Sequence, residues 1–250
     1  MKHIKKFNSV EQCKDYTNIN SIHPAVYKIS NNNFKYVYKA GNYIQDGLVF
    51  QLDGKYKGPS ENICTDIISG NYIINSSTGT LNYKYKDDCL EILNVNDCTP
   101  TITFDKSFSS SDDYTVELCF ELSQVNSKMF LFNIGVNHSP AFVINNSSIC
   151  FLQRSNQYIF NNFTTNTKYT FSLNLNHGYC NNVELSQDSE DYWGSGTLNK
   201  MYIFNVHSGG MRNNPLLGKL YAIRIYDRRL TSEEQLHNQN IDAKRFNITI

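Results

Sequence analysis

Two glutamates lie on one face of a predicted strand, in a pattern that could support acid–base chemistry. The stretch Y-T-V-E-L-C-F-E-L, residues 114–122, alternates between apolar and other residues, which is typical of a strand with one buried face. The apolar face carries Val116, Leu118, Phe120 and Leu122. The opposite face carries Glu117, Cys119 and Glu121. Paired carboxylates are the catalytic groups of most glycosidases, but no second acidic strand accompanies this one. We therefore predict that this face is solvated or lines a concave surface.

A second candidate site is an aromatic segment within a polar stretch. The only tryptophan, Trp193, lies in S-E-D-Y-W-G-S-G, among acids and glycines, so we expect it in a loop. An aromatic ring in such a loop can stack on a sugar ring while a carboxylate accepts hydrogen bonds from the hydroxyls. The candidate carbohydrate-binding residues are therefore Trp193, Tyr192 and Asp191. The alternative is that Trp193 folds back and covers an edge of the domain.

No residue pattern predicts a metal or cofactor site. The six histidines are scattered along the sequence, without the spacing of zinc ligands. Adjacent acids that could donate oxygens to calcium occur at Asp87-Asp88, Asp112-Asp113 and Glu190-Asp191. A calcium site needs about six to eight oxygens, which such pairs alone do not supply. We predict no cofactor, and we leave calcium open without assigning a site.

The overall charge and the cysteines narrow the class of protein. The 250 residues include 23 basic and 23 acidic ones, a balance that lacks the basic footprint of nucleic-acid-binding proteins. Seven cysteines without a C-x-x-C pair fit neither a disulfide framework nor a zinc knuckle, so we expect free thiols in a reducing compartment. The N-terminus lacks the apolar core of a secretory signal. No apolar run is long enough to insert into a membrane.

Many short strands separated by turns must position these residues. Strand patterns follow one another along most of the chain, among them L-V-F-Q-L, C-L-E-I-L, K-Y-T-F-S-L-N-L and L-Y-A-I-R-I-Y. Such a series, with almost no helix, predicts a mainly β sandwich or barrel. One helix is expected near the C-terminal end, where Thr231 is the N-cap and Glu234 completes a capping box.

The N-terminal part of the chain forms a separate small unit in this interpretation. Residues 3–7 predict a short strand and residues 10–19 a short helix. Two more strands flank the turn-forming asparagines at 31–33. We therefore divide the chain into a small β-α-β-β anchor unit, residues 1–42, and a large β domain that ends in a short helix, residues 43–250. The anchor unit is too short to bury much core alone, so its apolar residues need a partner surface.

The two ends of the large domain resemble a known family. The opening Y-I-Q-D-G-L-V-F-Q-L-D-G and the closing G-K-L-Y-A-I-R-I-Y-D-R-R-L-T-S-E-E are similar to the first and last strands of concanavalin A-like, laminin G-like domains. The resemblance covers roughly residues 43–246 and implies a mainly β jelly-roll sandwich. Glycosidases of this fold carry an aspartate between paired glutamates, where this chain has Cys119. The resemblance therefore implies a protein that is not an enzyme.

The anchor unit resembles a module that precedes such domains in proteins of Bacteroides and of crAss-like phages. H-I-K-K-F, E-Q-C-K-D-Y and H-P-A-V-Y-K-I carry that likeness. It implies a phage virion structural, decoration or fibre protein with a lectin-like head, and host-surface glycans as its ligands. We expect a homo-oligomer held by residues 1–42, bound to other virion proteins in virions that assemble in the host cytoplasm. The alternative is a bacterial carbohydrate-binding or adhesin module outside a virion.

Overall fold

The structure is a computed structural model, and it contains three separate β-sheets and one helix among the residues it describes. Those residues are 23–30, 33–39, 43–54, 67–68, 74–75, 80–86, 88–96, 100–109, 113–124, 129–134, 141–145, 148–153, 156–189, 197–203 and 217–250. Every strand pair in this part of the chain is antiparallel. The predicted helix at 10–19 and the predicted strand at 3–7 lie outside the described residues.

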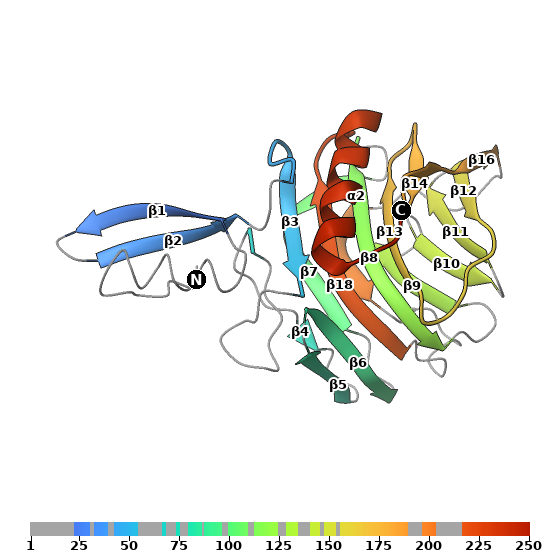
Figure 1. The fold of residues 1–250 in the computed structure, drawn as a ribbon, viewed down its shortest axis with the longest axis horizontal. Coiled ribbons are helices and arrows are strands. Elements are labelled where there is room, and N and C mark those ends of the chain that lie inside the picture. Colours follow the sequence, from blue (N-terminus) through green and yellow to red (C-terminus); the bar gives the residue numbers. More distant parts are fainter. Residues whose placement is uncertain are drawn as a thin grey trace.

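Two eight-stranded sheets form the sandwich (Figure 1). The sheet nearer the helix, here called the helix-side sheet, has the order β15-β14-β13-β8-β18-β6-β5, with β3 also paired to β18. Its strands are β3 (Leu48–Asp53), β5 (Thr80–Lys86), β6 (Cys89–Asn96), β8 (Thr115–Gln124), β13 (Lys168–Leu173), β14 (Gly178–Cys180), β15 (Val183–Glu184) and β18 (Leu217–Tyr226).

The second sheet, here called the outer sheet, has the order β16-β12-β11-β10-β9-β17-β7-β4. Its strands are β4 (Ile74–Asn75), β7 (Pro100–Ser109), β9 (Met129–Ile134), β10 (Ala141–Asn145), β11 (Ser148–Gln153), β12 (Asn156–Phe160), β16 (Ser186–Ser189) and β17 (Thr197–Ile203). The third sheet is a separate hairpin of β1 (His23–Ser30) and β2 (Asn33–Lys39).

The core between the sandwich sheets follows the predicted alternation. The apolar face of β8 is buried: Val116, Leu118, Phe120 and Leu122. Aromatic rings join the two sheets, since Phe160 of β12 meets Phe171 of β13 edge to face at 5.7 Å between ring centroids. The predicted mainly β sandwich is confirmed. The short strands β4, β14 and β16 were not predicted, because two to four residues carry too little periodicity to be recognised.

The single described helix, α2 (Ser232–Phe246), covers the outward face of the helix-side sheet (Figure 1). Its predicted capping box is present: the Thr231 side chain accepts from the backbone N–H of Glu234, and the Glu234 carboxylate accepts from the N–H of Thr231. Asn247 ends the helix in a left-handed conformation. No described helix is long and apolar enough to cross a membrane.

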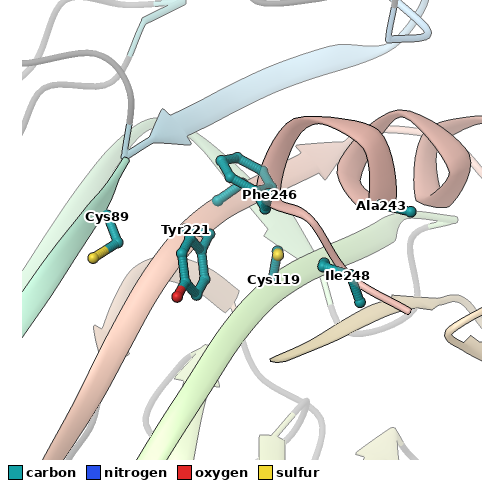
Figure 2. Packing of buried hydrophobic residues seen from close by; sticks show 7 residues of the cluster. Cys89, Cys119, Tyr221, Ala243, Phe246 and Ile248 are labelled. Carbon is teal, nitrogen blue, oxygen red and sulfur yellow. The ribbon is translucent and has the colours of Figure 1, made fainter. Parts of the chain in front are cut away.

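An apolar cluster fixes the C-terminal end of α2 to the sheet. Figure 2 shows Ala243 and Phe246 of the helix with Ile248, beside Cys119 of β8 and Tyr221 of β18. The rings of Tyr221 and Phe246 lie 5.4 Å apart between centroids. Because these side chains are buried together, they hold the helix against the sheet.

Candidate functional site

The predicted carboxylate face of β8 lies under α2, which corrects the prediction that it is solvated. Glu117 is 1% exposed, and Cys119 lies in the apolar cluster beneath the helix. Glu121 is also buried, where it accepts hydrogen bonds from Lys219 at 2.8 Å and from the hydroxyl of Tyr221 at 3.0 Å. The strand alternation was correctly assigned, but a helix distant in sequence covers the second face.

A buried ion-pair network centres on Arg224, which is 1% exposed. Its Nε donates to Glu117 Oε2 at 2.6 Å, and its two Nη groups donate to both carboxylate oxygens of Asp242 in α2. The guanidinium also lies over the ring of Tyr43, 3.9 Å from its centroid. The hydroxyl of Tyr43 donates to Asp242 Oδ1 at 2.7 Å. One buried cation therefore joins β8, β18, α2 and the start of the domain.

Helix α2 meets this network with polar side chains. The buried polar residues of the helix recur at helical spacing: Gln235, Asn238, Gln239 and Asp242. Asn238 donates to both oxygens of Glu117, at 3.1 and 3.0 Å, and to the hydroxyl of Tyr226. Gln239 donates to the backbone carbonyls of Thr170 and Tyr179. A satisfied polar interface of this kind defines one helix position, because each shift would leave buried groups unpaired.

The electrostatics of the network fit a structural function. Burial raises the pKa of Glu117 above its ordinary value, against the opposing effect of Arg224. Burial alone would lower the pKa of Arg224, but the Asp242 and Glu117 carboxylates raise it well above the ordinary value. Glu117 and Glu121 are four strand residues apart, about 13 Å along the backbone. That exceeds the roughly 5–9.5 Å between the carboxyl groups of glycosidases. The two carboxylates also have separate partners: Glu117 binds Asn238 of the helix, whereas Glu121 binds Lys219 and Tyr221 of β18.

A half-exposed polar cluster occupies one end of the sandwich. This rim cluster consists of Asp113, Asn176, His177, Glu184 and Arg229. Arg229 pairs with Asp113 at 2.5 Å and donates to Asn176 Oδ1 at 3.0 Å. Nδ1 of His177 lies 3.4 Å from Glu184 Oε1. The His177 ring stacks on that of Tyr179, 6.3 Å between centroids. The cluster thus combines an aromatic face with planar hydrogen-bonding groups.

A buried asparagine fixes the shape of the rim cluster. Oδ1 of Asn174 accepts from the backbone N–H groups of Asn176 and His177, at 2.8 and 2.9 Å. Its Nδ2 donates to the backbone carbonyl of Leu230, next to Arg229. The turn after β13 and the segment after β18 are therefore joined by one side chain, which preorganises the cluster.

Two polar atoms at this end are buried without a hydrogen-bond partner among the described residues: the Tyr158 hydroxyl and Nε of Arg229. Burial, with a further contribution from Glu184, raises the pKa of Tyr158 to about 12. The Tyr158 ring packs directly against Gly178, where an added Cβ would lie 2.8 Å from it. Buried polar groups are normally paired, so each of these two atoms needs a partner that the described residues do not supply.

The predicted residues Asp191, Tyr192 and Trp193 lie outside the described residues, between β16 and β17. The two described flanks lie at the same end of the outer sheet, with four strands between them, and Ser189 is the one toward the rim cluster. Phe160 contacts Tyr169, and Tyr158 contacts Gly178, so β12 runs beside β13 with Asn156 toward the rim cluster. Ser189 pairs with Asn156. The register of the outer sheet also places the first residues of β17 at this end.

The other candidate groups form no metal site among the described residues. No group of three or more potential metal ligands is present in that part of the chain. Of the predicted acidic pairs, Asp113 binds Arg229, whereas Asp87, Asp112, Glu190 and Asp191 lie outside the described residues. The four described cysteines are free thiols: Cys89, Cys119, Cys150 and Cys180.

Comparisons with known proteins identify the fold class. No protein-family model and no curated protein matches the sequence. Among solved structures, the binding domain of Paraclostridial Mosquitocidal Protein 1 superimposes with a TM-score of 0.57 at 15% identity, over 78% of this chain and 52% of that one. Trypanosoma rangeli sialidase in complex with sialic acid gives 0.60 at 13% identity, over 94% and 38%.

The Botulinum neurotoxin serotype D binding domain gives a TM-score of 0.58 at 14% identity, over 79% of this chain and 51% of that one. The chain thus spans about half the length of the two binding domains and a smaller part of the sialidase. Identities this low establish the fold alone. The chain has the jelly-roll β-sandwich fold.

Proposed function

We propose that the protein is a carbohydrate-binding module whose binding site includes the rim cluster. The observation that carries this proposal is the pair of buried polar atoms, the Tyr158 hydroxyl and Arg229 Nε, which have no partner among the described residues. They lie at the same end of the sandwich as exposed amide, imidazole and carboxylate groups. Ligand sites combine such convergent polar groups with aromatic surface.

The chemistry of the cluster suits sugar hydroxyls. A hydroxyl both donates and accepts, and Glu184 offers an acceptor while Arg229 and Asn176 offer donors. The His177 ring, supported by Tyr179 behind it, offers a flat surface for a sugar ring. Since Asn174 already fixes the turn, little side-chain and backbone order has to be gained on binding.

The charge around the cluster favours neutral glycans over acidic ones. Arg229 is already paired with Asp113. Glu184 is exposed, and the fully exposed Glu233 at the start of α2 is close enough to His177 to interact with it electrostatically. A ligand carboxylate would therefore meet more negative than unpaired positive charge. Two of the structural neighbours are binding domains, which is compatible with a binding module.

The aromatic segment predicted from the sequence belongs to the same proposal. Ser189 and Thr197 end and begin their strands at one end of the outer sheet, with β12, β11, β10 and β9 between them. We propose that Asp191, Tyr192 and Trp193, which lie in the sequence between these two strands, contribute to carbohydrate binding together with the rim cluster.

A glycan array followed by calorimetry tests the proposal with two matched arginine variants. Arg229→Ala should raise the dissociation constant of the most tightly bound neutral glycan about tenfold or more, because it removes charge-assisted hydrogen bonds. Arg228→Ala is the control, since its neighbouring and similarly exposed guanidinium pairs with Glu234 and Asp46 instead. The dissociation constant of the Arg228→Ala variant should stay within about threefold of the wild-type value. Equal loss in both variants, a preference for sialylated glycans, or no glycan bound would overturn the proposal.

We further infer binding without turnover, because both carboxylates of β8 are already bound within the protein: Glu117 by Arg224 and Asn238, and Glu121 by Lys219 and Tyr221. Incubation of the bound glycan with the protein should return it unchanged by mass spectrometry. Hydrolysis that disappears in Glu121→Gln would contradict this inference.

The setting we propose for this module is the head of a phage virion fibre or decoration protein. The support is the resemblance of residues 1–42 to a virion-associated module and the separation of the β1–β2 hairpin from both sandwich sheets. Detection of the chain in purified particles is the expected result. Its absence from particles, with glycan binding retained, would favour a bacterial carbohydrate-binding or adhesin module.

A further inference from the structure

Charge is unevenly distributed along the chain. Residues 1–42 hold seven of the 23 basic residues and two of the 23 acidic ones, a net charge of +5. The remaining 16 basic and 21 acidic residues lie in 43–250, a net charge of −5. The neutral total thus conceals a basic N-terminal part and an acidic sandwich part, which would attract each other.

The β1–β2 hairpin carries part of the positive charge on a separate sheet. Its strands hold Lys28, Lys35 and Lys39 and no acidic residue. They pair with each other and with no described strand of the sandwich, and Figure 1 shows them extending away from it. An isolated two-stranded hairpin is at best marginally stable in water, so this one needs a surface to bind.

The register divides the hairpin into two chemically distinct rows. One row consists of the pairs Pro24–Tyr38, Val26–Tyr36 and Lys28–Phe34. The alternate row consists of the pairs His23–Lys39, Ala25–Val37 and Tyr27–Lys35. Successive residues of a strand belong to opposite faces, so the first face is mainly aromatic and apolar and the second holds two of the three lysines. An amphipathic hairpin of this kind combines apolar burial with attraction to an acidic surface.

We propose that the hairpin of one copy docks on the acidic sandwich of a second copy, in a head-to-tail assembly. A contact between two hairpins would bring like charges together, whereas hairpin and sandwich are oppositely charged. The described sandwich has exposed carboxylates outside the rim cluster, among them Asp46 and Asp88. Because the two contacting surfaces differ, each copy can bind one neighbour and be bound by another, which produces a ring or an open filament.

Sedimentation of the full-length protein over a concentration series tests this proposal. In about 50 mM salt we expect reversible association, and in about 500 mM salt an apparent dissociation constant at least about tenfold higher, since salt screens exposed charges. The double variant Lys35→Glu, Lys39→Glu reverses two charges of the hairpin and should weaken association about tenfold or more at low salt. Circular dichroism confirms that the sandwich stays folded.

The control is Lys84→Glu, Lys86→Glu, which reverses the charge of the two lysines in sandwich strand β5. It makes the sandwich more acidic, so association should not weaken. A monomer at every concentration overturns the proposal. So does association that strengthens with salt, as a symmetric contact between two hairpins would, or a loss of association that is equal in both double variants. Glycan binding does not depend on this result and is tested separately.

Discussion

The buried guanidinium of Arg224 gives the sharpest test of how α2 is held. Arg224→Met keeps most of the side-chain volume but removes the only cation that contacts Glu117 and Asp242 in the described network. These carboxylates are 1% and 0% exposed. Removing one partner of a buried pair costs about 3–5 kcal/mol of the free energy of unfolding, because the remaining charge stays desolvated. Since two carboxylates lose the same partner, we expect a loss at the upper end of that range.

Urea unfolding at pH 7, followed by circular dichroism, measures this loss. Arg228→Met is the control, because that guanidinium is 28% exposed and its ion pairs lie at the surface; we expect a cost of about 0–1 kcal/mol. Adding Asp242→Asn to the Arg224→Met variant removes one orphan charge and should recover part of the lost stability. If Arg224→Met costs less than about 1 kcal/mol, the network does not hold the helix as described.

The pH dependence of the Arg224→Met variant has a defined sign. Burial raises the folded-state pKa of an unpaired carboxyl above its unfolded value. The penalty is then absent below the unfolded pKa, grows as pH rises toward the folded pKa, and is complete above it. The variant should therefore regain part of its lost stability between about pH 7 and pH 5. A difference from the wild type that stays constant over this range would contradict the assignment of the loss to orphan charge.

Three further predictions concern the helix start, one glycine and the thiols. Glu234→Ala should lower the free energy of unfolding in urea by about 1 kcal/mol. Hydrogen bonds from Arg228 lower the pKa of Glu234. The stability that the Glu234 carboxylate contributes is therefore complete above the ordinary carboxyl pKa and should vanish as pH falls through the lowered value. Gly218→Ala should cost about 1–3 kcal/mol, because its Cβ would lie 2.3 Å from the carbonyl oxygen of Glu121; an unchanged urea midpoint would show that the strands separate easily there. Iodoacetamide should modify the half-buried Cys150 before the buried Cys119 and Cys180, because burial raises the pKa values of the latter two thiols. Peptide mapping identifies the order of modification. Modification of Cys119 first would show that α2 opens readily.

The strand pattern was predictable because alternation is a local property. The inward face of β8 followed from residues 114–122, and the membership of L-V-F-Q-L and L-Y-A-I-R-I-Y in the sandwich followed from the two ends of the domain. The capping box of α2 was also readable, since Thr231 and Glu234 are three residues apart. Such signals lie within a few neighbouring residues, and tertiary packing did not overrule them.

The cover over the outward face of β8 depends on contacts between distant parts of the chain. Glu117 and Asn238 are 121 residues apart, so no local pattern joins them. A signal was nevertheless present: Arg224 interrupts the otherwise apolar strand L-Y-A-I-R-I-Y. The polar residues at 235, 238, 239 and 242 recur at helical spacing. A charged residue in a core strand and a polar stripe on a short helix together indicate a buried polar interface.

The rim cluster was not predicted because its residues come from four separate segments. Asp113, Asn176, Glu184 and Arg229 have no motif in common, and the topology of the helix-side sheet brings them together. The predicted residues Asp191, Tyr192 and Trp193 were chosen by composition alone. Their link to the rim cluster stays a proposal that depends on where their flanking strands end.

The most direct test of the central claim is a crystal structure of the protein bound to the neutral glycan that ranks first on the array. We predict a sugar ring over His177, with hydroxyls within hydrogen-bond distance of Arg229, Asn176 or Glu184, and with the Tyr158 hydroxyl paired to the ligand or to an ordered water. The Arg224–Glu117–Asp242 network should be unchanged, with α2 in place. A glycan bound elsewhere on the sandwich, with the rim cluster unoccupied, would contradict the account.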